Sequence, residues 1–437
     1  MIIQGIGVWL PSKKRLNSEW PPSFSAGARS SGPPAADASN KVNLAKTRGD
    51  DGGTGGGIVS QDRTFNDMQT PIETEIAEVA RPFLERESKD PFLGVKERRV
   101  ADKNETVAVT AAIASRNALE DAKLHAKDVD VIIGNAPVPD YLPMQVAASV
   151  ARELGCRSGG DDENNDTNAG SSAGSGGVLA FDIDAGCASG LIGMEIAQGM
   201  LSNDPDKVIL VVVTNLLTRI QPMEHPSSPG LGDGAVAFVL TSGGRSRREN
   251  GDGLLSLKVN SIVAHTHPEF SNAVIYVRDK NLRCAPQKWF EVSDKPLYLG
   301  SHESQRVKYL MQNTIALLIK TVKEAIRKAD GAREDLVDID YLVSVQPRGF
   351  IPIVASKILN MQTISTYETL GHLGGAGFMM NLYELKRRGS LQRPGTKVAC
   401  YCQGSGFIRG AAVLEVVRAG NDDNVQGGGN VPLRSSL

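Results

Sequence analysis

The sequence carries no strong excess of either charge and few cysteines. Its 437 residues include 48 basic and 50 acidic side chains, a formal net charge of -2, and this balance gives no electrostatic basis for binding nucleic acid. The five cysteines are odd in number and lack metal-type pairing, which favours a reducing compartment over a disulfide framework. Cys400 and Cys402 alternate along a predicted strand, so we expect no metal site there.

Long apolar runs are also missing. No segment stays apolar for the roughly 18 residues that a membrane-spanning helix requires. The N-terminal run MIIQGIGVWLPSKK is too short for a secretory signal and predicts a first strand. We therefore expect a cytoplasmic protein, and 437 residues are enough for two domains or two closely fused halves.

Two stretches of low complexity interrupt the apolar pattern. Residues 21–64 are rich in Pro, Gly and Ser, and residues 157–177 are similarly poor in apolar side chains. Because such compositions cannot bury a core, we predict disordered insertions that the surface tolerates. The predicted organisation is an N-terminal half (1–245), a C-terminal half (252–420) and a flexible tail (421–437).

The most informative stretch is DIDAGCASGLIGMEIAQGM, residues 182–200. It predicts a strand that turns sharply into a helix that is apolar nearly all round and therefore buried. Small residues flank Cys187, so other backbone segments can approach its sulfur, and the positive end of a helix dipole favours a thiolate. A buried cysteine that merely fills space is the commoner case, but this glycine-flanked turn favours Cys187 as a nucleophile.

The second half of the chain repeats the order of elements in the first. The repeated pairs are VDVIIGNAP (129–137) with IDYLVSVQP (339–347), the Cys187 stretch with TLGHLGGAGFMMNLYELKRRG (369–389), and KVILVVVTN (207–215) with KVACYCQGS (397–405). This duplication predicts an α/β protein whose two βαβ-rich halves share one core and hold a site between them. The equivalent loops then carry Cys187 and His372, each at the start of a central helix.

Several segments together form a recognisable pattern. GVKERRVADKNETVA, DIDAGCASGLIGM, GDGAVAFVL and the closing GSGFIRGAAVLE resemble the thiolase superfamily, and within it the β-ketoacyl carrier-protein synthase III group. The resemblance covers nearly everything outside the insertions. It implies a five-layered αβαβα sandwich, usually a homodimer, and acyl transfer through a cysteine thioester. It also implies an oxyanion hole made by the backbone N–H groups of Cys187 and Ser405.

The chain departs from the usual catalytic residues of that family. The position of the HQxN motif carries Gln346-Pro347-Arg348-Gly349, without histidine, and the position of the GNTSAA motif carries His372. A similar relocation occurs in family members that transfer a whole acyl group without decarboxylation, and it implies that His372 is the base. His265 and His267 lie near a position that the family places beside the active site, and for them we favour a structural or gating role over catalysis.

Three functions follow from these observations. The first is acyl transfer from a carrier-protein or CoA thioester to an acceptor in fatty-acid-like or polyketide-like metabolism. The second is a decarboxylating synthase III in which Gln346 and His372 supply two hydrogen-bond donors. The third is a non-catalytic subunit of a heterodimer. The segment ERESKDPFL lacks, at the matching spacing, the tryptophan and arginine that the family uses at the nucleotide end of CoA, which favours a carrier-protein donor. We expect no bound cofactor and no metal.

Overall fold

The structure is a computed structural model. It describes residues 1–21, 24, 71–143, 145–158, 177–221, 223, 225, 227–243, 254–271, 275–277, 298–300, 304–331 and 338–418. The predicted insertions at 21–64 and 157–177 lie almost entirely outside these residues, and the predicted tail at 421–437 lies wholly outside them.

The main sheet has ten strands, and its order shows the same arrangement twice. The order is β12-β11-β13-β14-β8-β1-β7-β6-β4-β5. The strands of the first half are β1 (Ile2–Trp9), β4 (Val131–Asn135), β5 (Leu179–Asp182), β6 (Ile209–Leu216) and β7 (Asp233–Thr241). Those of the second half are β8 (Ser256–Thr266), β11 (Tyr341–Ser344), β12 (Gln362–Thr363), β13 (Lys397–Gly404) and β14 (Ile408–Arg418). The two groups of strands join where Ile2 and Ile3 of β1 pair with β8.

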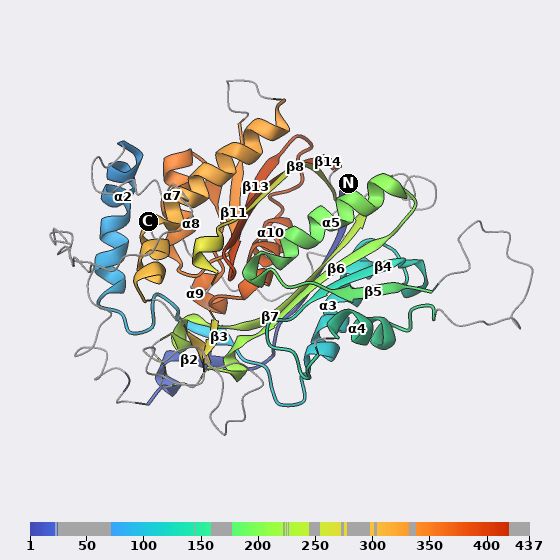
Figure 1. Cartoon of the computed structure of the whole chain (residues 1–437), viewed down its shortest axis with the longest axis horizontal. Coiled ribbons are helices and arrows are strands. Elements are labelled where there is room, and N and C mark those ends of the chain that lie inside the picture. Colours follow the sequence, from blue (N-terminus) through green and yellow to red (C-terminus); the bar gives the residue numbers. More distant parts are fainter. Residues whose placement is uncertain are drawn as a thin grey trace, which may run out of the picture.

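Helices cover both groups of strands and also lie between them (Figure 1). The central helices are α5 (Ser189–Asn203) and α10 (Gly377–Arg387), the outer helices of the first half are α3 (Val107–Asp121) and α4 (Val146–Leu154), and those of the second half are α7 (Ser304–Ala329) and α8 (Phe350–Leu359). Separate hydrophobic clusters fill the central layer and the two outer interfaces. The predicted five-layered thiolase-like sandwich is confirmed.

Residue size determines how closely these layers approach. The alanine-rich helix α3 lies directly on β1, where a Cβ on Gly7 would stand 2.1 Å from the carbonyl oxygen of Ala114 and 2.1 Å from the backbone nitrogen of Ala118. Glycine on the strand and alanine on the helix therefore permit backbone contact that a larger side chain would prevent.

The remaining elements lie outside the layers. They are the paired β2 (Lys14–Leu16) and β3 (Glu97–Arg99), the paired β9 (Ile275–Val277) and β10 (Tyr298–Gly300), and the helices α2 (Pro71–Glu87) and α9 (Tyr367–Leu370). None of the helices in the described part of the chain has the length and apolar character needed to cross a bilayer.

Candidate active site

Cys187 lies in a tight turn between β5 and α5. The turn is a single 3-10 turn, η3 (Gly186–Ala188), and α5 begins only at Ser189. Its first residue, Gly186, has a φ of +54°, a conformation that glycine adopts without strain. The Ser189 hydroxyl accepts from the Ala185 N–H at 2.9 Å and donates to the Gly186 carbonyl at 2.8 Å. The backbone around the thiol is therefore fixed by a local hydrogen-bonded loop.

The turn between β13 and β14 packs directly against the Cys187 turn. A Cβ on Gly404 would lie 2.7 Å from the Cys187 nitrogen, and a Cβ on Gly186 would lie 2.6 Å from the Ser405 nitrogen. The positive φ in this second turn, +103°, falls on Gly406, and Ser405 itself does not adopt a positive φ. Serine is therefore accommodated without backbone strain. The backbone nitrogens of Cys187 and Ser405 stand on two touching turns, an arrangement compatible with the predicted oxyanion hole.

His372 reaches Cys187 from the other half of the chain. Its Nε2 lies 3.6 Å from the Cys187 Sγ, a distance at which a thiol can donate to an imidazole. The backbone of His372 is held on both sides, because its N–H donates to Gly230 at 2.7 Å and its carbonyl accepts from Gly232 at 3.2 Å. Both Cys187 and His372 keep part of their surface exposed. The two predicted catalytic residues are thus brought together where a small reactant can approach them.

Burial keeps both groups uncharged at neutral pH. Cys187 and His372 are each partly exposed to solvent, but protein atoms surround the sulfur and the imidazole ring on most sides. Burial raises the pKa of the Cys187 thiol to about 12, and the Asp184 carboxylate adds to this rise. Burial lowers the pKa of His372 to about 4, and the backbone of Gln346 partly opposes that change. The predicted thiolate is therefore wrong, since desolvation exceeds the effect of a helix that starts only after the cysteine.

The prediction that Cys187 and His372 occupy symmetric positions is also wrong, because His372 lies three residues before the position equivalent to Cys187. In the second half the 3-10 turn η7 (Gly374–Ala376) leads into α10 as η3 leads into α5. Its first glycine has a φ of +53°, matching the +54° of Gly186. The symmetric equivalent of Cys187 is therefore Gly375. The Gly-Cys and Gly-His pairs look alike in sequence, but the 3-10 turn that leads into the helix starts at Gly186 in the first half and at Gly374, not Gly371, in the second.

The side chain of Gln346 is buried and hydrogen-bonded to backbone groups. It is 2% exposed, its Nε2 donates to the Ile364 carbonyl at 3.4 Å, and its Oε1 accepts from the Thr366 N–H at 3.2 Å. The neighbouring side chain of Val345 belongs to the hydrophobic cluster against which Cys187 packs. Both ends of the Gln346 amide therefore already have backbone partners.

The two secondary histidines bind other groups. His265 Nε2 lies 2.8 Å from the Glu324 carboxylate. His267 Nε2 accepts a hydrogen bond from Arg409 Nε at 2.7 Å, and the backbone N–H of His267 donates to the Phe407 carbonyl at 2.9 Å. Because Phe407 belongs to the turn that carries Ser405, this backbone hydrogen bond from His267 helps to fix that turn. The described contacts place neither histidine against Cys187.

Sequence reasoning did not single out the ends of β4 and β6. Asn135 and Asn215 are buried there, and the only sequence signal is a polar residue at the end of each apolar strand. No three His, Cys, Asp or Glu side chains gather as a metal site anywhere in the described ranges.

Comparison with known proteins points to one family. Residues 181–261 match the family described as 3-Oxoacyl-[acyl-carrier-protein (ACP)] synthase III. The β-ketoacyl-[acyl-carrier-protein] synthase III of Aliivibrio fischeri is 26% identical over 367 residues, covering 83% of this chain and 98% of the relative.

Solved structures of such proteins share the fold. The 3-oxoacyl-[acyl-carrier-protein] synthase III of Aquifex aeolicus VF5 superposes with a TM-score of 0.61 at 18% identity, covering 94% of this chain and 99% of that one. The priming β-ketosynthase of the R1128 polyketide biosynthetic pathway gives a TM-score of 0.62 at 17% identity, covering 95% and 96%. The chain is therefore similar in sequence to β-ketoacyl-[acyl-carrier-protein] synthase III enzymes and has the fold of their solved structures.

Proposed function

We propose that this protein transfers an acyl group from a pantetheine thioester to an acceptor through a thioester on Cys187. The observation that carries the proposal is the 3.6 Å contact between the Cys187 Sγ and the His372 Nε2. It joins a nucleophile and a base across the two halves of the fold, both neutral and both partly exposed.

The first half-reaction acylates the enzyme. His372 Nε2 takes the thiol proton as Sγ attacks the thioester carbonyl carbon. The C–S bond to pantetheine then breaks, and the leaving thiolate takes that proton from Nε2. For Nε2 to accept, the ring proton must stand on Nδ1, which is buried without a hydrogen bond of normal geometry among the described residues.

Two backbone N–H groups stabilise the oxyanion that forms during the attack. The Cys187 and Ser405 turns touch through Gly186 and Gly404, so their nitrogens are held in place before substrate arrives. Fixed donors of this kind are worth about 10²–10³ in rate where one has been removed from other enzymes.

The second half-reaction moves the acyl group to an acceptor hydroxyl, amine or carbon acid. The acceptor loses its proton to His372 Nε2 and attacks the thioester carbon, and the Cys187 sulfur leaves and regains that proton. The relatives named for acyl-carrier-protein substrates and polyketide priming support a carrier-protein or CoA thioester as donor. They also support a place in fatty-acid-like or polyketide-like metabolism.

The alternative is decarboxylating condensation. It needs two donors on the malonyl thioester, and the Gln346 amide is already bonded to Ile364 and Thr366. This engagement favours transfer of a whole acyl group. A non-catalytic role is disfavoured, because a silent site has no need of a thiol 3.6 Å from an imidazole.

Intact-mass spectrometry after incubation with acyl thioesters tests the proposal. We expect one acyl adduct that disappears in Cys187→Ala, while Cys156, Cys284, Cys400 and Cys402 stay unmodified. An adduct that survives this substitution would remove Cys187 as the nucleophile. Incubation with a radiolabelled malonyl donor separates the two reactions, because only condensation releases carbon dioxide.

A further inference from the structure

The ends of two adjacent parallel strands carry buried amides that the proposed mechanism does not use. Asn135 ends β4 and is 1% exposed, and Asn215 near the end of β6 is 0% exposed. Asn135 Oδ1 and both amide atoms of Asn215 lack hydrogen-bond partners among the described residues. Buried polar atoms in native proteins almost always have partners, so three unpaired atoms at neighbouring strand ends call for a function.

Both amides face the layer that contains Cys187. Val211 and Val213 of β6 belong to the central cluster against which Cys187 packs, whereas Val212 belongs to the outer cluster. Side chains alternate along a strand, so Asn215 points to the central side with Val211 and Val213. The same parity places Asn135 on that side, and it pairs with Val213 across the ladder.

The Asn215 amide and Cys187 both lie against the turn η7. A Cβ on Gly375 would be 3.5 Å from the Cys187 Cα and 3.2 Å from a methyl of Val213, while a Cβ on Gly374 would be 2.5 Å from Asn215 Oδ1. Cys187 and Asn215 therefore lie against the same pair of glycines. Asn135 is tied to the chain that leads into Cys187, because its Nδ2 donates to the Ile183 carbonyl at 2.8 Å.

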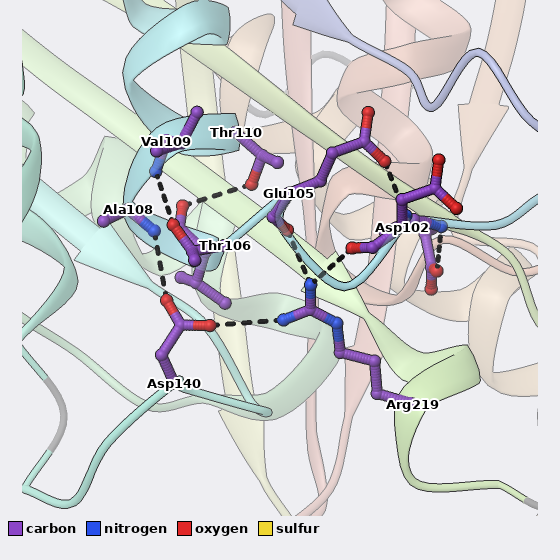
Figure 2. Close-up of polar contacts among 11 residues, drawn as sticks. Asp102, Glu105, Thr106, Ala108, Val109, Thr110, Asp140 and Arg219 are labelled. Carbon is purple, nitrogen blue, oxygen red and sulfur yellow. Dashed lines mark hydrogen bonds and ion pairs between the residues drawn. The ribbon is translucent and has the colours of Figure 1, made fainter.

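The backbone after Asn215 is fixed, so the amide cannot turn outward with it. Thr218 donates from its N–H and its hydroxyl to the buried Asp233. The next residue, Arg219, is also held in place (Figure 2). It forms an ion pair with Asp140 at 3.2 Å and donates hydrogen bonds to the backbone carbonyls of Asp102 and Glu105. The amide is thus held beside the Cys187 turn.

We propose that these amides recognise a hydroxyl group on the acyl chain that Cys187 carries. The inference rests on the proposed acyl-enzyme. Asn215 Nδ2 donates, and the two Oδ1 atoms accept, so the complementary group is neutral and both accepts and donates a hydrogen bond. A hydroxyl is the smallest such group. Because the amide atoms are enclosed, binding a hydroxyl there requires the Gly374–Gly375 dipeptide to move aside.

The test compares acyl groups of equal chain length. N-acetylcysteamine thioesters of butyrate and of 2-, 3- and 4-hydroxybutyrate are supplied to the intact protein, and the rate of Cys187 adduct formation is followed by mass. We expect at least one hydroxyacyl donor to react roughly tenfold or more faster than butyryl, because a site with unpaired polar groups rejects the analogue that lacks the hydroxyl.

Three variants test whether a preference for hydroxyacyl donors depends on Asn215. Asn215→Leu should abolish the preference. Asn215→Asp, which keeps the shape but removes the donor, should reduce it even if the leucine variant folds poorly. Thr214→Val is the matched control, because Thr214 also carries an unpartnered buried hydroxyl but points to the opposite face, and this variant should keep the preference.

The outcomes separate this inference from the proposed function. Equal rates for all four donors, or a preference that persists in both Asn215 variants, would overturn the hydroxyl recognition while leaving the acyl-enzyme intact. Absence of any adduct from any thioester would overturn the acyl-enzyme itself, and the inference with it.

Discussion

At the scale of single residues, the His372 side chain can be removed without disturbing its surroundings. Its turn is held through the backbone, by hydrogen bonds with Gly230 and Gly232. We expect His372→Ala to lower the rate of Cys187 acylation by about 10²–10⁴, the usual contribution of a positioned base. Stopped-flow measurement of thiol release from an acyl thioester gives this rate, and thermal melting checks the fold.

The matched control is His265→Ala. His265 is paired with Glu324, so this variant should keep the full rate. A full rate in His372→Ala, or greater damage in His267→Ala, would move the base to another histidine.

The neutral state of the pair predicts an unusual pH profile. His372 acts as a base only when unprotonated, and its pKa is lowered to about 4, so the base is available at every pH above about 5. The thiol stays protonated below its raised pKa of about 12. The rate of acylation should therefore be flat between about pH 5.5 and 8.5. A rise with a midpoint near 6.5, the ordinary histidine value, would contradict this assignment.

At the scale of elements, the left-handed glycine before Cys187 is essential to the site. Gly186 has a φ of +54° and abuts Ser405, whose Oγ would lie 2.3 Å from an added Cβ. Gly186→Ala should destabilise the protein by about 1–3 kcal/mol from the backbone conformation alone and should abolish acylation by separating the two turns. Urea unfolding and adduct mass measure the two effects.

Gly199→Ala in α5, the helix that follows this turn, is the control for that substitution. Nothing described lies within 4 Å of a Cβ at this position, and alanine is favoured over glycine inside a helix by about 0.5–1 kcal/mol. The control should therefore be as stable as the parent or more so, with unchanged acylation. Equal behaviour of the two variants would show that the turn does not depend on its glycine.

At the scale of the whole molecule, the two halves share the central layer. Leu191 of α5 and Leu382 of α10 are both 0% exposed and belong to the same hydrophobic cluster. We expect a single calorimetric transition. Leu191→Ala and Leu382→Ala should each lower its midpoint, because a buried Leu→Ala change costs about 2–5 kcal/mol. Val417→Ala, at a 45% exposed position, should shift it little. Two separate transitions, each sensitive to one substitution, would mean that the halves unfold independently.

Much of the fold and one half of the site could be predicted from the sequence because their causes are local. Short β-branched runs such as residues 208–214 favour buried strands, and β6 is buried along its whole length. The small residues around Cys187 indicate a tight turn wherever that turn lies in space. The repeated order of elements then predicts two matching groups of strands, which the sheet order shows.

What the tertiary structure alone decided depends on groups that are distant in the chain. His372 lies 185 positions after Cys187, and only the packed central layer brings Nε2 to the sulfur. The protonation of the pair follows from burial, a property of the assembled fold that overrode the local helix dipole. The direction of the Gln346 side chain and the unpaired state of Asn215 likewise depend on which backbone groups pack beside them. The sequence by itself therefore predicted the elements and the two residues proposed for catalysis, whereas contacts between the halves decided the distance between those residues, their burial and the polar groups beside them.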